Sequence, residues 1–268
     1  MLVAYLQFYP EKGNIKNNLE KIESMIDDAE FDILVLPELA TTGYFFVNKE
    51  EIKDLAEEAG NGVSFKHFKR IAKKKNSLII YGFAERENQI YYNSQAAIFP
   101  DGSYIIYRKT HLFYKEKMVY QPGNTGPVVV EFKGAKIGLM ICFDWFFPEF
   151  SRILALKGAQ ILAHSANLVL PGMAQKGMVV RSMENRIFSI TANRIGEENS
   201  SEGEKLLFTG MSQIVNPSGE VLTSSERDTE ELKTVEIEPK EADNKNITAL
   251  NNIFTDRRID IYKDILEK

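Results

Sequence analysis

Short apolar runs alternate with amphipathic segments through the first third of the chain. Residues 2–8 and 33–36 are nearly continuous apolar runs, as expected of buried strands. Between them, apolar residues recur at helical spacing, at Ile15, Leu19, Ile22, Ile26 and Ala29. A helix over 65–72 and a strand over 78–84 follow by the same criteria. This order predicts β-α-β units, in which helices connect parallel strands.

From residue 94 onward, pairs of short apolar runs are separated by turn residues. These pairs predict hairpins over 94–107, 128–141 and 214–222. The remaining pattern predicts helices over 148–156 and 178–185, strands over 161–163, 188–192 and 234–237, a polar loop over 197–204 and a helical tail over 256–266. No linker-like stretch, composition break or repeat interrupts the chain. We therefore expect one α/β domain over residues 1–268, with a core built on two sheets.

The composition is that of an ordinary globular protein and narrows the range of partners. The 268 residues are 44% hydrophobic and 26% charged, with a formal net charge of -5. This charge disfavours general binding to nucleic acid or to an anionic membrane, because the mean field repels both. No apolar stretch approaches the length of a membrane span, and the first residues lack a basic leader pattern. We expect a cytoplasmic protein that acts on a small molecule.

The single cysteine, Cys142, is the first candidate for chemistry. The familiar nucleotide-binding, zinc-protease and GxSxG motifs are absent from the sequence. A lone cysteine is usually a small buried hydrophobe. Cys142, however, lies where the apolar run 136–141 ends in a turn, and ligands gather at the carboxyl ends of strands in α/β sheets. This position favours a nucleophilic thiol, which requires a base to activate it.

The residue pattern leaves two kinds of base open. One is a histidine, and the chain has three, at His67, His111 and His164. The other is Glu38, which follows the strand over 33–36 and would have a raised pKa in an apolar pocket. Lys109 ends another predicted strand and, if buried, needs a carboxylate partner such as Glu38 or Glu116.

Three segments in this order, PELATTGY, YRKTHLF and ICFDWFFPE, resemble the nitrilase superfamily of carbon-nitrogen hydrolases. The resemblance extends over nearly the whole chain and includes YNSQAAIFPDG, QPGNTG, HSANLVLP, RSMENRIFSITANRIGEE, FTGMSQIVNPSGEVL and DRRIDIY. It implies a catalytic triad of Glu38, Lys109 and Cys142, with Glu116 as the family's additional active-site glutamate. It also implies a four-layer α-β-β-α sandwich and a homodimer, or a higher homo-oligomer, in which the tail 254–268 packs on the partner subunit.

The resemblance further implies a covalent mechanism in which the thiol attacks a small amide or nitrile and forms a thioester. Tyr44, Phe143, Trp145 and Asn167 match positions that bind substrate in relatives, with the backbone N–H of Phe143 helping to stabilise the developing anion. Neither a cofactor nor a metal is expected, since no cluster has metal-ligand spacing. Asp144 and His164 are expected to play structural roles near the nucleophile.

The same resemblance bears on the substrate class. The WFFPE segment is closer to archaeal-type nitrilases and carbamoylputrescine amidases than to ω-amidases, which commonly carry Arg where this chain has Phe146. We expect aliphatic amides first, nitriles second and N-carbamoyl amines third. The alternatives are a Cys-His hydrolase that uses His111 or His164, and a catalytically silent relative that acts as a scaffold.

Overall fold

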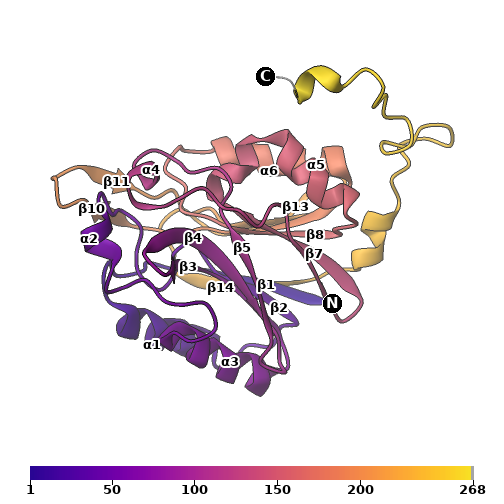
Figure 1. Ribbon diagram of the computed structural model, residues 1–268. Helices are drawn as coiled ribbons and strands as arrows, with labels where there is room; N and C mark the ends of the chain where they lie inside the picture. Colours follow the sequence, from indigo (N-terminus) through magenta and orange to yellow (C-terminus); the bar gives the residue numbers. More distant parts are fainter. Residues whose placement is uncertain (267–268) are drawn as a thin grey trace.

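The computed structural model describes residues 1–266 and contains two six-stranded sheets that pack face to face (Figure 1). The first sheet has the order β14-β1-β2-β3-β4-β5, formed by β1 (Leu2–Gln7), β2 (Ile33–Val35), β3 (Leu78–Glu87), β4 (Ile90–Ile98), β5 (Tyr104–Arg108) and β14 (Glu231–Glu236). The second has the order β13-β12-β9-β8-β7-β6, formed by β6 (Val129–Phe132), β7 (Ala135–Ile141), β8 (Ile161–Ser165), β9 (Phe188–Ala192), β12 (Gln213–Val215) and β13 (Val221–Ser224).

Helices cover the outer face of each sheet. Figure 1 shows α1 (Ile15–Ile26) and α3 (Val63–Lys75) beneath the first sheet, and α5 (Pro148–Leu156) and α6 (Met173–Asn185) above the second. Shorter helices are α2 (Lys49–Ile52), α4 (Glu116–Val119) and the 3-10 helices η1 (Cys142–Phe146), η2 (Pro239–Asp243) and η3 (Lys263–Ile265). The layers therefore follow the expected α-β-β-α order.

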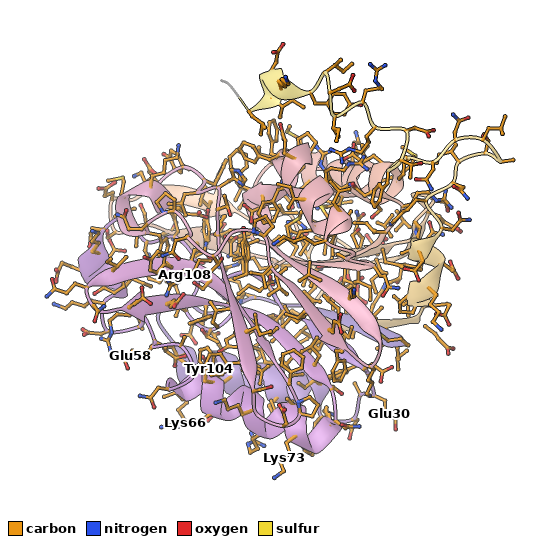
Figure 2. All side chains as sticks on the ribbon, turned by 45° about the vertical axis from the view of Figure 1, so that its right-hand side comes forward. Glu30, Glu58, Lys66, Lys73, Tyr104 and Arg108 are labelled. Carbon is orange, nitrogen blue, oxygen red and sulfur yellow. The ribbon has the colours of Figure 1, made fainter. Side chains whose placement is uncertain are left out.

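The alternation of side chains in the first sheet explains why it is covered on both faces. In β1, Val3 and Tyr5 belong to the core shared with the second sheet, whereas Ala4 and Leu6 belong to the core under the helices. The helices that cover this sheet, α1 and α3, each turn one apolar face toward it. Phe65 of α3 is buried against the sheet, while Lys66 and Lys73 extend outward (Figure 2).

The topology brings strand ends from both sheets to one place. β1, β2 and β3 are parallel to one another, and so are β7, β8 and β9. β5 runs in the direction of β3, because each is antiparallel to β4. The sheets are joined where these strands end, since the Ser165 hydroxyl donates to the Leu36 carbonyl over 2.7 Å. Glu38, Lys109 and Cys142 each follow one of these strands.

Three predicted segments differ from the structure. Helix α6 begins at Met173 rather than at residue 178. The predicted loop over 197–204 contains β10 (Glu197–Asn199), which pairs with β11 (Lys205–Leu207) in a hairpin. The helical tail is wrong: residues 256–266 form turns and the short η3, and Ile259, Ile261 and Ile265 are exposed, so no apolar core supports a helix there.

The prediction that the tail 254–268 packs on a partner subunit concerns an interface between chains. The last two residues of this tail, 267 and 268, lie outside the described residues. Within residues 1–266, no helix is both long enough and apolar enough to cross a membrane.

Candidate active site

Cys142 stands at a sharp turn between β7 and η1. Its backbone has φ of 38°, an uncommon value for a residue other than glycine and a form of strain that is concentrated at functional sites. Asp144 holds the turn: its Oδ2 accepts hydrogen bonds from the Ile141 N–H (3.1 Å) and from the Tyr107 hydroxyl (2.6 Å). The expected structural role of Asp144 is therefore seen in its contacts.

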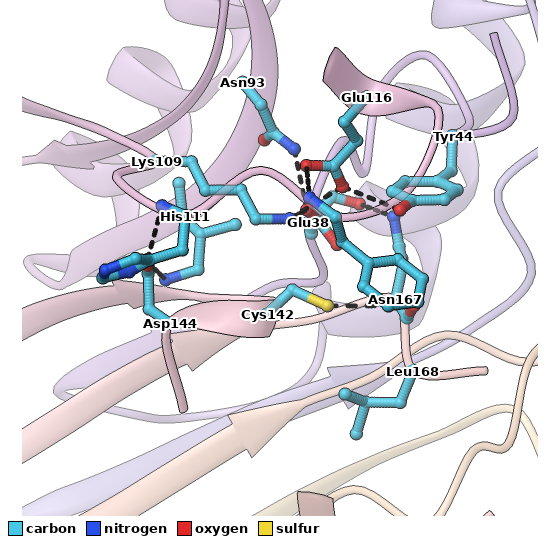
Figure 3. A network of polar contacts seen from close by, with 12 residues as sticks. Glu38, Tyr44, Asn93, Lys109, His111, Glu116, Cys142, Asp144, Asn167 and Leu168 are labelled. Carbon is cyan, nitrogen blue, oxygen red and sulfur yellow. Dashed lines mark hydrogen bonds and ion pairs between the residues drawn. The ribbon is translucent and has the colours of Figure 1, made fainter. Parts of the chain in front are cut away.

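A buried network of charges lies beside this turn (Figure 3). The Lys109 ammonium contacts Glu38 Oε1 and Glu116 Oε1, each at 2.7 Å, and all three side chains are almost fully excluded from solvent. Asn93 donates to Glu38 Oε1 over 2.7 Å. The lysine thus has the carboxylate partners that its burial requires.

Glu116 is fixed by further donors. The Tyr44 hydroxyl donates to its Oε1 over 2.7 Å, and the backbone N–H of Phe113 donates to its Oε2 over 3.0 Å. Glu38 differs, because its Oε2 has no hydrogen-bond partner among residues 1–266. One oxygen of Glu38 is therefore held by donors, and the other is free to accept a proton.

Asn167 connects the network to the thiol. Its backbone carbonyl accepts a long hydrogen bond from Cys142 Sγ (3.9 Å), and its side-chain Nδ2 donates to the Glu38 carbonyl (2.8 Å). Figure 3 shows Cys142, Asn167 and the Glu38–Lys109–Glu116 network in one close group. Six of the residues singled out in the sequence thus meet in the interior: Glu38, Tyr44, Lys109, Glu116, Cys142 and Asn167.

The electrostatics of the site separate the roles of its groups. Burial raises the pKa of the Glu38 carboxyl to about 7, since the Lys109 ammonium offsets only part of the desolvation and Glu116 adds repulsion. Burial, and then the charge of Glu38, raise the pKa of the Cys142 thiol well above its usual range. For Lys109, burial opposes the charge, but Glu116 and Glu38 outweigh it and raise the pKa of the ammonium. The site therefore combines a neutral thiol, a permanent cation and a carboxylate that titrates near neutrality.

Two of the three histidines, His164 and His111, form hydrogen bonds with other groups. His164 Nε2 lies 3.0 Å from the Cys142 carbonyl, and burial lowers the pKa of this histidine to about 4, so the ring is neutral. His111 contacts Asp144 through Nδ1 at 2.8 Å and stacks on Phe147, with ring centroids 3.7 Å apart. His67 lies on α3, under the first sheet, near Glu23. These contacts do not place a histidine as the base of a Cys-His pair.

A small cavity adjoins the thiol. It measures about 20 Å³, which is room for one water-sized group, and its lining carries no charged side chain. The lining residues are Phe113, Cys142, Phe143, Trp145, Asn167, Leu168, Val169, Leu170 and Ala174. Phe143, Trp145 and Asn167 thus line this cavity, whereas Tyr44 contributes its hydroxyl to the glutamate network. Phe143 is the second residue of η1, where backbone N–H groups lack acceptors within the helix.

Sequence reasoning missed several supports of the site. Asn93 belongs to a run of three consecutive polar residues, 93–95, in β4, and all three are buried. That run is the signal that the sequence offered for it, since Asn93 donates to Glu38. Glu198 accepts from the backbone N–H groups of Tyr44 and Phe45 at 2.9 Å and pairs with the buried Arg194. A signal for this pair is the i,i+4 spacing of its opposite charges, of which Glu198 falls within the predicted loop over 197–204 and Arg194 precedes it. Within residues 1–266, no group of three or more acidic, histidine or cysteine side chains is arranged to hold a metal ion.

The chain is similar to known proteins in sequence and in fold. The family description of carbon-nitrogen hydrolases matches residues 2–245. A nitrilase of Pyrococcus abyssi is 41% identical over 97% of this chain and 98% of its own length. An N-carbamoylputrescine amidase of Arabidopsis thaliana is 30% identical over 99% of this chain and 95% of its own. The crystal structure of a carbon-nitrogen hydrolase from Helicobacter pylori G27 superposes with a TM-score of 0.87 at 27% identity and covers 100% of this chain and 98% of that one.

Proposed function

The chain belongs to the carbon-nitrogen hydrolase family of the nitrilase superfamily, and from this premise we propose that it hydrolyses small uncharged amides or nitriles through a thioester on Cys142. The observation that carries the proposal is the buried Glu38–Lys109–Glu116 network beside a thiol that is neutral at rest. A neutral thiol needs a base, and the free oxygen of Glu38 belongs to a carboxyl group that titrates near pH 7.

In the proposed first half of the reaction, Glu38 takes the proton of the Cys142 thiol while the sulfur attacks the carbonyl or nitrile carbon. Lys109 and the backbone N–H of Phe143 stabilise the negative charge that develops on the substrate. Loss of one such donor typically costs about 2.7–4 kcal/mol in the barrier. Glu38 then gives its proton to the departing ammonia, and Glu116 keeps Lys109 in position.

In the second half, water hydrolyses the thioester with Glu38 acting again as the base. The products are a carboxylic acid and the free thiol. A nitrile enters the same route and consumes one additional water before the thioester stage, because its carbon is at the oxidation level of an acid but carries no oxygen.

The character of the pocket supports a small acyl group without charge. Phe143, Trp145 and Leu168 present apolar surface beside the sulfur, and the lining offers no cation for a second carboxylate and no anion for an amine. Such a lining favours aliphatic amides and nitriles over N-carbamoyl amines, because no acidic side chain is present to meet an amine. Of the two favoured classes, we place aliphatic amides first. The Pyrococcus relative is named a nitrilase and the Arabidopsis relative an N-carbamoylputrescine amidase. Nitriles and N-carbamoyl amines are therefore included in the substrate test below.

The identity of the base is tested by comparing Glu38→Gln with His111→Asn and His164→Asn. We expect Glu38→Gln to abolish ammonia release from a short aliphatic amide while the protein stays folded, and each histidine variant to retain turnover. Turnover by Glu38→Gln together with its loss in a histidine variant contradicts the proposed base and favours the Cys-His alternative.

The substrate class is tested with matched panels of short aliphatic amides, nitriles and N-carbamoyl amines, followed by ammonia release. We expect the amides to give the highest kcat/KM. A protein that releases no ammonia from any of the three classes and gains no acyl mass on Cys142 is the scaffold relative instead.

We also propose that the protein is a single-domain homodimer in which the tail contacts the partner. In support, Ile153 and Leu156 on α5, and Ile259, Ile261 and Ile265 in the tail, expose apolar surface that a monomer leaves in water. Light scattering on the purified chain tests this, with a mass of twice 30.5 kDa expected.

A further inference from the structure

Tyr120 is embedded among the residues that hold the two carboxylates. It directly follows α4, and its backbone N–H donates to the Glu116 carbonyl over 2.8 Å. Its ring is 2% exposed and packs in the apolar cluster that contains Leu39, the neighbour of Glu38, and Tyr44, which donates to Glu116. The same residue lines a cavity of about 440 Å³ together with Phe143 and the segment that follows Lys109.

The hydroxyl of Tyr120 is buried without a hydrogen-bond partner among residues 1–266. Of the five other buried tyrosines among residues 1–266, Tyr5, Tyr44, Tyr81 and Tyr107 have a partner for the hydroxyl, and Tyr92 is not among the side chains buried without one. Leaving a buried hydroxyl unpaired is unfavourable, and phenylalanine fills the same space without that penalty. The packing of the cluster alone therefore does not account for the oxygen atom of Tyr120.

The charges around this hydroxyl keep it protonated. Burial, followed by the carboxylates of Glu116 and Glu38, raises the pKa of the Tyr120 phenol well above its usual range. It therefore acts as a hydrogen-bond donor and does not supply a proton to the reaction. Glu38 Oε2 is the complementary group, because it is an unpaired buried acceptor and its neighbour Leu39 packs in the same apolar cluster as Tyr120.

We propose that the Tyr120 hydroxyl is a further catalytic group, which holds the water that hydrolyses the acyl-enzyme. This inference rests on the proposed thioester route and assigns a role within its second half. The water oxygen forms a bond to the thioester carbon, and one water proton passes to Glu38. The C–S bond then breaks, and the proton returns from Glu38 to the Cys142 sulfur. Tyr120 keeps its own proton throughout.

The test isolates deacylation with Tyr120→Phe, which removes one oxygen atom and preserves the ring. A p-nitrophenyl ester of a short aliphatic acid acylates the thiol quickly, so nitrophenolate appears in a burst that reports acylation and then in a slow phase that reports deacylation. We expect the burst rate to stay as in the unchanged protein and the slow phase to fall roughly tenfold or more, as for a lost hydrogen bond to a reacting group. Intact mass spectrometry should show the acyl group on Cys142 persisting longer by the same factor.

The matched control is Tyr5→Phe, because the Tyr5 hydroxyl is buried and bonded to Ser225 Oγ at 2.9 Å. We expect Tyr5→Phe to lower the thermal midpoint and to leave both kinetic phases unchanged. Tyr120→Phe should show the reverse: an unchanged or higher midpoint and a slower second phase. An unchanged slow phase in Tyr120→Phe, or an equal slowing in both variants, overturns the role of Tyr120. If the unchanged protein shows neither burst nor acyl adduct, the thioester route itself has failed.

Discussion

The substitution Asp144→Asn tests how the turn that carries the nucleophile is held. Asp144 is fully buried, and its two oxygens accept four hydrogen bonds: from the Ile141 N–H (3.1 Å), the Tyr107 hydroxyl (2.6 Å), and the N–H (3.1 Å) and Nδ1 (2.8 Å) of His111. An asparagine supplies one acceptor oxygen and one NH₂ group, which cannot accept any of them.

The cost follows from counting the donors left unpaired. If the NH₂ group faces His111, the imidazole can switch tautomer and accept from it, so only the His111 backbone N–H loses its partner. If it faces Tyr107 and Ile141, the hydroxyl can turn and the Ile141 N–H is left. One buried donor without a partner costs about 1–3 kcal/mol, and the two bonds that remain weaken by about 1 kcal/mol each, because they lose a charged acceptor. We therefore expect a loss of about 3–5 kcal/mol in the free energy of unfolding.

Urea unfolding of Asp144→Asn measures this loss, and Asp228→Asn, at an exposed position, controls for the removal of one negative charge. Turnover per folded molecule should also fall, since the strained backbone of Cys142 is held by the Asp144 contact to Ile141. A change below about 1 kcal/mol, with turnover equal to that of the control, shows that Asp144 does not hold the turn.

Three further predictions concern the base and its surroundings. Gly82→Ala should destabilise the fold and remove activity, because the new Cβ would lie 2.5 Å from Glu38 Cα and from the Leu39 nitrogen, and these backbone atoms cannot move without distorting the site. A variant that is stable in a melting assay and fully active in a turnover assay contradicts this expectation. Tyr44→Phe removes a 2.7 Å donor from Glu116 and should lower kcat about tenfold without loss of folding, as judged by steady-state kinetics beside circular dichroism. The pH profile of kcat/KM should fall below about pH 7, since burial raises the Glu38 pKa to about 7 and only the carboxylate form accepts the thiol proton; a profile that is flat between pH 5 and 8 is inconsistent with that base.

The order of helices and strands could be predicted because strands buried on both faces appear in the sequence as short, nearly continuous apolar runs. The alternation in β1 assigns Val3 and Tyr5 to one core and Ala4 and Leu6 to the other, and the helical spacing in α1 matches the second. The hairpin β10–β11 was not predictable from apolar pattern, since it is fixed by the buried pair of Glu198 and Arg194. The tail was misassigned because spacing alone predicts a helix wherever apolar residues recur, and here no surface of the described chain buries them.

For the site, strand ends were enough to nominate Cys142, Glu38 and Lys109, but not to choose between a carboxylate and a histidine as the base. That choice depends on long-range contacts. His164 is engaged by the Cys142 carbonyl and by Thr191, and Glu38 keeps one free oxygen, features that no local pattern records. Asn93 and Tyr120 were missed for the same reason, since the bond from Asn93 to Glu38 and the unpaired hydroxyl of Tyr120 depend on what lies across the fold.

The most direct measurement is rapid-quench intact mass spectrometry during turnover of a short aliphatic amide, followed by peptide mapping. We expect a transient mass gain equal to the acyl group, located on Cys142, which forms in the unchanged protein and does not form in Glu38→Gln. Ammonia released with no covalent species, or an acyl group carried by a different residue, contradicts the proposed thioester on Cys142.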